Sequence, residues 1–282
     1  MMPRLSIDFE PALIESSRTA LLELGFTLTP YAHALVLVGG WVPWLLIRDH
    51  LRRGETFTHV GSIDIDFVVD PNGLPGDESQ TMAQLMEAVG WRHVPVRHFA
   101  FERTLVGRDR IARDILVDFL SPAPEGNAAE YLQREIQPDL RAKTLKGAEI
   151  ALVHHAPQRL SGLLPDGSSA TVEIQMLDVA GCLGTKGIAL GARFKHKDAY
   201  DIVSILDNYG AGVREVSERV RPFVKEPLMR ESLQVIREKF ATERSDGPTW
   251  YAEFLQPGDD AARLRFRQRA YQLAAEFLRL IA

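Results

Sequence analysis

SIDIDFVVD, residues 62–70, decides the expected fold class, because apolar and acidic residues alternate along it. A period of two is typical of a β-strand with one buried face. Asp64 and Asp66 then lie on the same face, close enough to repel each other. A divalent cation between them would remove that repulsion, and Mg²⁺ is the usual partner of carboxylates and phosphates. Taken alone, the pair is more often the solvent-facing side of an edge strand, so a metal site needs further residues.

A second element lies upstream, where two glycines separate two predicted elements. Ala34–Val38 predicts a short strand, and Trp41–Arg53 predicts a helix, so Gly39-Gly40 lies at a strand-to-helix junction. Glycines let a phosphate approach the backbone closely, and a helix N-terminus offers unpaired N–H groups to an anion. The alternative is a tight turn that only glycine can form.

A third element lies downstream, in the apolar run ILVDFL at residues 115–120. Asp118 interrupts this run, and a lone carboxylate inside an apolar strand is costly unless it is paired or binds a metal. Asp114 is the competing acid, but it lies at the edge of the strand and is expected to be solvated. Phe99–Val106 and Ile115–Leu120 are expected to pair as an antiparallel hairpin with a long charged connection.

The rest of the chain predicts an α+β protein, with a mixed α/β core over residues 1–175 and a mainly helical part over residues 176–282. Ala156–Ser169, rich in Pro, Gly and Ser, is interpreted as a surface loop, as are Pro71–Ser79 and Pro122–Asn127. Further helices are expected at Pro11–Leu24, closed by Gly25, and at Thr81–Val89, Asp178 to Leu190, His196–Tyr209, Glu231–Glu243 and Asp259–Ile281.

Composition narrows the cellular setting. The only cysteine, Cys182, excludes an internal disulfide and a cysteine-based metal site, and it favours a reducing cytoplasm. The most apolar segment, Ala34–Ile47, is shorter than the ~20 residues that span a bilayer, so we expect a soluble protein with no membrane partner.

The charges are unevenly distributed along the chain. Residues 176–282 hold 17 Lys and Arg against 15 Asp and Glu, and the remainder holds 16 Lys and Arg against 23 Asp and Glu. The acidic first part suits a metal site, whereas the basic excess of the second part is weak support for a phosphate-bearing partner.

Together, Val38-Gly39-Gly40, Asp64-Ile65-Asp66 and Asp118 resemble the signature of the nucleotidyltransferase superfamily, the fold of DNA polymerase beta. That signature is a hydrophobic-Gly-Gly/Ser step at a helix start, then Asp-x-Asp on a strand, then a third carboxylate on a later strand. Ser62 also fits, because the superfamily often has Ser or Thr two residues before the first Asp. The resemblance implies a nucleotidyltransferase-type mixed β-sheet with flanking helices.

A second resemblance concerns the later part of the chain. The second half of AbiEii-type nucleotidyltransferases is similar to three stretches of this chain, Thr185–Leu190, Arg193 and Lys197–Ile202. That family includes toxins of bacterial toxin–antitoxin pairs. The resemblance implies that Lys186 contacts the triphosphate and that Asp198 organises the site. The alternatives are an exposed helix lysine and a capping or salt-bridging aspartate.

The chain also departs from these families. Where they often have an arginine ahead of the Ser/Thr-x-Asp motif, this sequence has Val60 with His59 beside it. The stretch between Gly40 and Asp64 is also a few residues longer than is usual in the family.

The resemblance implies two-metal phosphoryl transfer from a nucleoside triphosphate such as ATP to a hydroxyl acceptor, with release of pyrophosphate. The acceptor would be tRNA or a protein, and a toxin would have a cognate antitoxin as partner. An antibiotic-modifying type of nucleotidyltransferase and a non-catalytic nucleotide-binding protein are the alternatives. The implied ligands of Mg²⁺ or Mn²⁺ are Asp64, Asp66 and Asp118, and the implied nucleotide-binding residues are Gly39, Gly40, Ser62, Lys186 and Asp198.

Other residues receive simpler interpretations. His154-His155 is read as a loop or strand-end pair, and His196 as a solvated residue at a helix start. Cys182 is interpreted as structural. A solvated helix face is expected to carry the four arginines Arg263, Arg265, Arg267 and Arg269. The core is expected to contain Trp41 and Trp44.

Overall fold

The computed structural model describes residues 4–74, 80–123, 132–255 and 258–282 of the chain. It divides into two compact units. We call them the sheet unit, Glu10–Trp41 and Ser62–Leu177, and the helical unit, Met1–Phe9, Val42–Gly61 and Asp178–Ala282.

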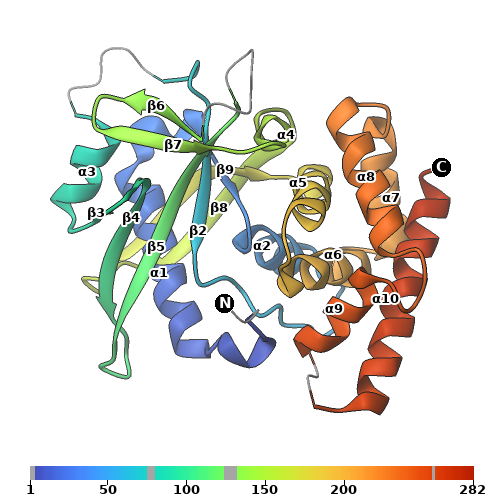
Figure 1. Ribbon diagram of the computed structural model, residues 1–282. Coiled ribbons are helices and arrows are strands. Elements are labelled where there is room, and N and C mark those ends of the chain that lie inside the picture. Colours follow the sequence, from blue (N-terminus) through green and yellow to red (C-terminus); the bar gives the residue numbers. More distant parts are fainter. Residues whose placement is uncertain (1–3, 75–79, 124–131, 256–257) are drawn as a thin grey trace. The chain divides into compact units, whose positions relative to one another are not determined.

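The sheet unit is built on a mixed β-sheet, in which nine strands of the described residues take part (Figure 1). The strands run in the order β3-β4-β5-β2-β1-β9-β8, and β7, which pairs with β6, joins the sheet beside β5. Their bounds are β1 Leu35–Val38, β2 Ile65–Val69, β3 Arg92–Val94, β4 Arg97–Val106, β5 Ala112–Ser121, β6 Gln133–Gln137, β7 Leu140–Thr144, β8 His155–Leu163 and β9 Ser169–Leu177. The protein is therefore α+β with a mixed sheet.

Strand direction decides which residues meet at the centre of this sheet. β2 pairs with β1 in the antiparallel direction and with β5 in the parallel direction. The apolar faces of these strands bury Phe67 and Phe119, whose ring centroids lie 6.4 Å apart. Asp66, between the buried Ile65 and Phe67, is consequently turned to the opposite face of the sheet, whereas Asp64 lies just before the strand, which begins at Ile65 and not at Ser62 as expected.

Three α-helices and one 3₁₀ helix complete the described part of the sheet unit: α1 (Pro11–Thr27), α3 (Met82–Ala88), α4 (Ala148–Val153) and η2 (Thr29–Ala34). α1 packs against β8 and β9. Gly25 does not end this helix as the sequence suggested. A Cβ atom at Gly25 would lie 3.0 Å from side-chain atoms of Val172 and Ile174, so the glycine serves a close approach between helix and sheet, and the helix continues to Thr27.

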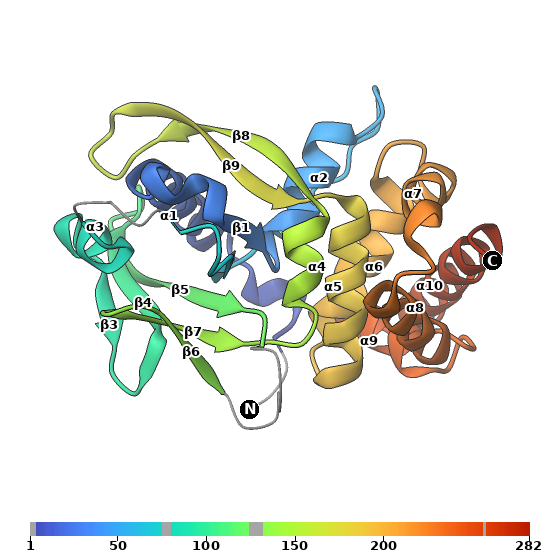
Figure 2. The ribbon, with the colours of Figure 1, turned by 90° about the horizontal axis from the view of Figure 1, so that it is seen from above.

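The helical unit contains α2 from Val42 onward, η1 (Ser6–Asp8), η3 (Arg221–Phe223) and six further helices. α6 packs against four of them and is almost wholly buried from His196 to Leu206 (Figure 2). The helices are α2 (Trp41–His50), α5 (Val179–Ala192), α6 (His196–Asn208), α7 (Val213–Val220), α8 (Pro227–Lys239), α9 (Asp246–Leu255) and α10 (Asp260–Leu280).

The segment Val42–Gly61 belongs to the helical unit although the sequence placed it in the first domain. Its contacts explain this membership. The His50 ring stacks on Tyr209, and the Gly210 N–H donates to the His50 carbonyl oxygen at 3.1 Å. Arg52 Nε returns a 2.7 Å hydrogen bond to the Gly210 carbonyl oxygen. The predicted boundary at 175/176 lies close to Asp178, where the helical unit resumes.

Several expected elements are confirmed. β4 and β5 pair as the predicted antiparallel hairpin, and Asp178 caps α5 by accepting a 2.8 Å hydrogen bond from the Gly181 N–H. The loop assigned to Ala156–Ser169 was wrong, because β8 occupies most of it. β8 is an end strand of the sheet and exposes much of its length, so polar residues there do not prevent strand formation.

Two further interpretations concern loops and helices. Of the loops predicted at Pro71–Ser79 and Pro122–Asn127, residues 75–79 and 124–127 lie outside the described residues. α7 and α9 were missed in the sequence, as both are short. None of the helices in the described ranges combines the length and the apolar character needed to cross a membrane.

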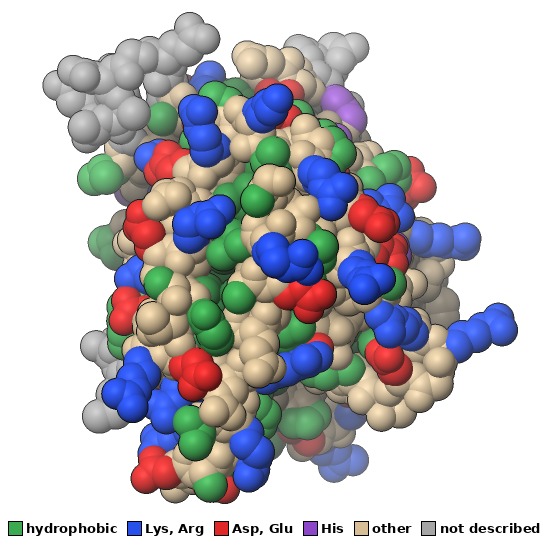
Figure 3. All heavy atoms as spheres, turned by 90° about the vertical axis from the view of Figure 1, so that its right-hand side faces the viewer, with side chains coloured by type: hydrophobic (Ala, Val, Ile, Leu, Met, Phe, Trp, Pro, Cys, Tyr) green, Lys and Arg blue, Asp and Glu red, His purple; other side chains and the backbone are tan. Residues whose placement is uncertain are grey.

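One face of the helical unit carries α7, α8 and α10 (Figure 3). Lys and Arg side chains are spread over it with Asp and Glu between them. Two of the four arginines at the start of α10 have acidic partners, Arg263 with Asp260 and Arg269 with Asp207. This mixture favours the solvated arginine face over a field of one sign.

Candidate functional site

The structure brings the predicted acids of the sheet unit together. In the parallel pairing of β2 and β5, Asp66 is the register partner of Asp118. Neighbouring strands lie ~4.8 Å apart, so these two carboxylates occupy adjacent positions on the same face of the sheet. Asp64, two residues before Asp66, immediately precedes β2. All three are half-buried.

Electrostatics show that the three carboxylates interact. Burial and the nearby charge of Asp66 raise the pKa of Asp118 to about 6, and Asp64 adds to the effect while Arg97 opposes it. Crowded carboxylates of this kind are the donor set that a hard divalent cation takes, because the cation removes their repulsion. The chemistry of the residues present therefore fits Mg²⁺ or Mn²⁺.

Gly39 lies against this acidic group. It has a φ of 78°, and a Cβ atom there would collide with the Asp66 carboxylate. Its neighbour Val38 is the register partner of Asp66 across β1 and β2, which explains the approach. Gly40 does not have a positive φ, so Gly39 is the glycine that the geometry requires.

Replacing Gly39 with alanine is expected to lower the free energy of unfolding by ~1–2 kcal/mol and to displace the Asp66 carboxylate. Gly167 is the matched control, because it has a φ of 85° with nothing within 4 Å of a Cβ atom. Gly167→Ala carries only the backbone strain. Urea unfolding and Mn²⁺ titration of both variants separate strain from the Asp66 contact. Equal losses of metal affinity in both variants would contradict this assignment.

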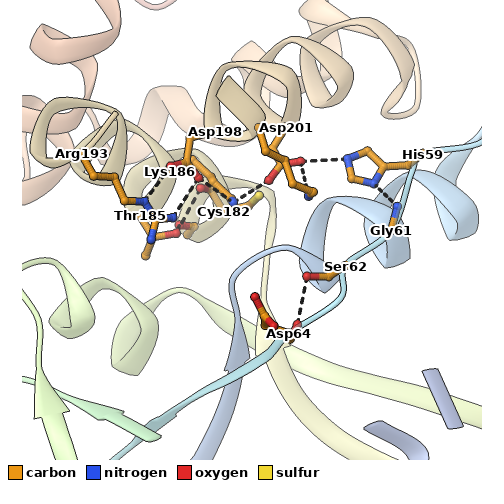
Figure 4. A network of polar contacts seen from close by, with 12 residues as sticks. His59, Gly61, Ser62, Asp64, Cys182, Thr185, Lys186, Arg193, Asp198 and Asp201 are labelled. Atoms are coloured by element: carbon orange, nitrogen blue, oxygen red, sulfur yellow. Dashed lines mark hydrogen bonds and ion pairs between the residues drawn. The ribbon is translucent and has the colours of Figure 1, made fainter. Parts of the chain in front are cut away.

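Ser62 has a local role. Its hydroxyl donates a 2.9 Å hydrogen bond to the carbonyl oxygen of Asp64, as Figure 4 shows. Ser62 is buried, and the bond fixes the turn by which the chain enters β2. The structure thus supports Ser62 as a residue that orders the Asp64 backbone.

Arg97, at the start of β4, was missed in the sequence. Its Nη2 atom donates to both carboxylate oxygens of Asp118, each at 2.8 Å. No sequence signal identified Arg97, because it follows a turn whose register with β5 depends on the sheet.

In the described ranges, no group of three or more His, Cys, Asp or Glu side chains is arranged to hold a metal ion.

The helical unit contains a separate cluster of buried charges, drawn in Figure 4. Lys186 Nζ donates to Asp198 at 3.1 Å and to Asp201 at 2.5 Å. Arg193 donates to both oxygens of Asp198, from Nε to Oδ2 at 2.8 Å and from Nη2 to Oδ1 at 3.0 Å. Lys186 is therefore not an exposed helix lysine, and Asp198 forms salt bridges rather than a helix cap.

Asp201 is the centre of this cluster, and the sequence did not single it out. Lys197, one turn earlier on α6, donates to it at 2.8 Å, and His59 Nε2 lies 3.0 Å from the same oxygen. Burial opposes ionisation of Asp201, but Lys186 and Lys197 hold its pKa far below the usual value. Burial lowers the pKa of Lys197 to about 8. The carboxylates of Asp198 and Asp201 thus accept from three basic side chains, Lys186, Arg193 and Lys197.

His59, the residue before Val60 where the families often have an arginine, connects the segment Val42–Gly61 of the helical unit to Asp201. The Gly61 N–H donates to its Nδ1 atom at 3.1 Å, so Nδ1 is the acceptor and Nε2 carries the proton that is donated to Asp201. The ring is therefore neutral. Burial lowers the pKa of His59 to about 4, in agreement with this tautomer.

A stability measurement against pH is expected to reveal His59. Its pKa is about 4 in the folded protein against an ordinary 6.5, so the unfolded chain binds more protons between these values. The free energy of unfolding should therefore fall as the pH drops from about 6.5 to about 4, on the order of 3 kcal/mol from this group.

His59→Gln is expected to lack that dependence. The raised pKa of Asp118 acts in the opposite direction over part of the same range, so the test is the difference between wild type and variant in urea unfolding. Parallel curves for the two proteins would contradict a buried neutral His59.

Two other predicted side chains lie in the helical unit. His196 was expected to be solvated, but it is buried between Phe194 and Trp250. The aromatic neighbours, which no local sequence pattern indicates, exclude water from it. Cys182 is buried, and burial raises its pKa to about 12, so it remains a thiol. His154 and His155 lie where α4 ends and β8 begins.

The predicted residues therefore fall into two groups. Asp64, Asp66, Asp118, Gly39, Gly40 and Ser62 belong to the sheet unit, and Lys186 and Asp198 belong to the helical unit. No family model matches the chain, and no curated protein matches it either. The resemblance to nucleotidyltransferases accordingly rests on the sequence motifs.

Proposed function

We propose that the protein is a metal-dependent nucleotidyltransferase of the DNA polymerase beta-like fold and of the AbiEii type. The observation that carries the proposal is the parallel register of Asp66 with Asp118, with Gly39 packed against the Asp66 carboxylate. Asp118 is far in sequence from Asp64 and Asp66, yet its strand lies beside β2, next to a glycine turn. A solvated edge strand would not gather them.

The mechanism follows from what each residue can do. Asp64, Asp66 and Asp118 would hold Mg²⁺ or Mn²⁺, which when bound neutralises phosphate charge and activates a hydroxyl. Asp118, with a pKa of about 6, is ionised at neutral pH and can accept the proton of the attacking hydroxyl. The acceptor oxygen forms a bond to the α-phosphorus of the triphosphate. The bond from that phosphorus to the leaving oxygen breaks and pyrophosphate departs.

Lys186 is the proposed contact to the triphosphate. Its ammonium group has three N–H donors, and Asp198 and Asp201 accept from it. Burial lowers its pKa, but the two aspartates more than compensate and raise it above the ordinary value, so Lys186 stays charged. Asp198 organises the group, since it fixes both Lys186 and Arg193.

The proposed acceptor is a hydroxyl of tRNA or of a protein, in the role of a toxin with a cognate antitoxin. An antibiotic-like small molecule is the alternative acceptor. A non-catalytic nucleotide-binding protein is favoured by one observation, the ion pair that Arg97 forms with Asp118.

Transfer of label tests the proposal. The protein is incubated with each α-³²P-labelled triphosphate, Mg²⁺ and either total tRNA or cell lysate, beside the double variant Asp64→Ala/Asp66→Ala. Label is expected in RNA or protein with the wild type alone. A non-catalytic protein would bind the nucleotide without transfer, and equal labelling by the double variant would remove support for these acids.

A further inference from the structure

Arg97 contacts the atoms that the proposed metal site needs. Both oxygens of Asp118 accept from one nitrogen of its guanidinium, at 2.8 Å each. A divalent cation bound to these oxygens would face the positive guanidinium at close range, so the two cations compete for the charge of Asp118. In the structure, both oxygens of Asp118 are thus engaged by Arg97.

The surroundings hold Arg97 without burying it. Its guanidinium carbon lies 5.3 Å from the centre of the Phe99 ring, and Lys143 Nζ lies 6.0 Å from the same ring. A contact of this kind contributes ~0.5–1 kcal/mol at an exposed site. The Arg97 side chain is 39% exposed, so it can leave Asp118 and reach solvent without breaking the core.

We propose that Arg97 is a displaceable counter-ion of Asp118, a positioning residue that competes with the divalent cation for this carboxylate. In the metal-free protein it neutralises the acid that Asp66 and Asp64 crowd. When the cation binds, Arg97 moves off Asp118, and the carboxylate joins Asp64 and Asp66. The inference rests on the proposed function, because it requires these acids to bind a metal.

Binding of Mn²⁺ alone, measured by calorimetry on the full chain at about pH 8 where carboxylates are ionised, tests the competition. Arg97→Gln is expected to bind Mn²⁺ about tenfold more tightly than wild type, the equivalent of one partly buried ion pair. Arg97→Ala should behave in the same way. Lys143→Gln is the matched control, since it removes a nearby positive charge without freeing the oxygens of Asp118, and a change of less than about threefold is expected.

Asp118→Asn completes the design. In this background Arg97→Gln should no longer tighten Mn²⁺ binding, because the contested carboxylate is gone. Unchanged affinity in both Arg97 variants, or an equal gain in Lys143→Gln, would overturn the inference and leave the metal site intact. Equal Mn²⁺ binding by wild type and Asp64→Ala/Asp66→Ala would instead overturn the metal site of the proposed function, and the inference with it. Thermal unfolding in EDTA establishes that each variant is folded.

Discussion

Asp66→Asn is expected to lower the rate of nucleotide transfer by about a thousandfold, the size of effect seen when a charged group at the reacting atoms is removed. Asp66 is the central acid of the sheet unit, next to Asp118 across the parallel strands and against Gly39. Asparagine keeps the shape of the side chain but removes its negative charge, so the proposed metal site is lost while the fold is kept. Initial rates at saturating Mg²⁺ measure the loss.

Asp114→Asn is the matched control for Asp66→Asn. Asp114 also lies on a strand of the sheet, but it is exposed and accepts a 2.6 Å hydrogen bond from Thr104. Its variant should keep transfer within about threefold of wild type and unfold at the same urea concentration. If both variants lost activity to the same extent, the acids of β2 and β5 would have no special part in the reaction.

Asp201→Asn is expected to lower the free energy of unfolding by ~3–5 kcal/mol, because removing one partner from a buried ion group leaves charges uncompensated. Lys186 and Lys197 both donate to Asp201, and all three side chains are buried. With asparagine in place, Lys197 loses the carboxylate to which it donates, and Lys186 keeps only that of Asp198. Urea unfolding at neutral pH, followed by far-UV circular dichroism, measures the difference.

The control for Asp201→Asn lies further along the same helix. Asp207 pairs with Arg269, whose side chain is 53% exposed. An exposed pair of this kind contributes ~0–1 kcal/mol, so Asp207→Asn should cost little. A similar small cost for Asp201→Asn would show that the buried charges are not held by Asp201.

The sequence by itself determined the pieces of the fold. Alternating residues over 62–70 define β2, and Asp178 with the apolar spacing after it defines α5. Patterns of this kind are local, since a period of two or of 3.6 depends only on neighbours in the chain. Local patterns also separated the acids of β2 from its buried face. They could not find β8, whose solvent-exposed length resembles a loop.

Tertiary structure decided which of these pieces meet. Asp66 faces Asp118 because the strands are parallel and in one register, and a slip of one residue would have turned Asp118 to the opposite face. Arg97 reaches Asp118, and His59 reaches Asp201, over sequence separations of 21 and 142 residues. No local pattern encodes such contacts, because they depend on how strands and helices pack. The sequence thus determined which residues carry charge, and the packing decided which charges are paired and which are buried.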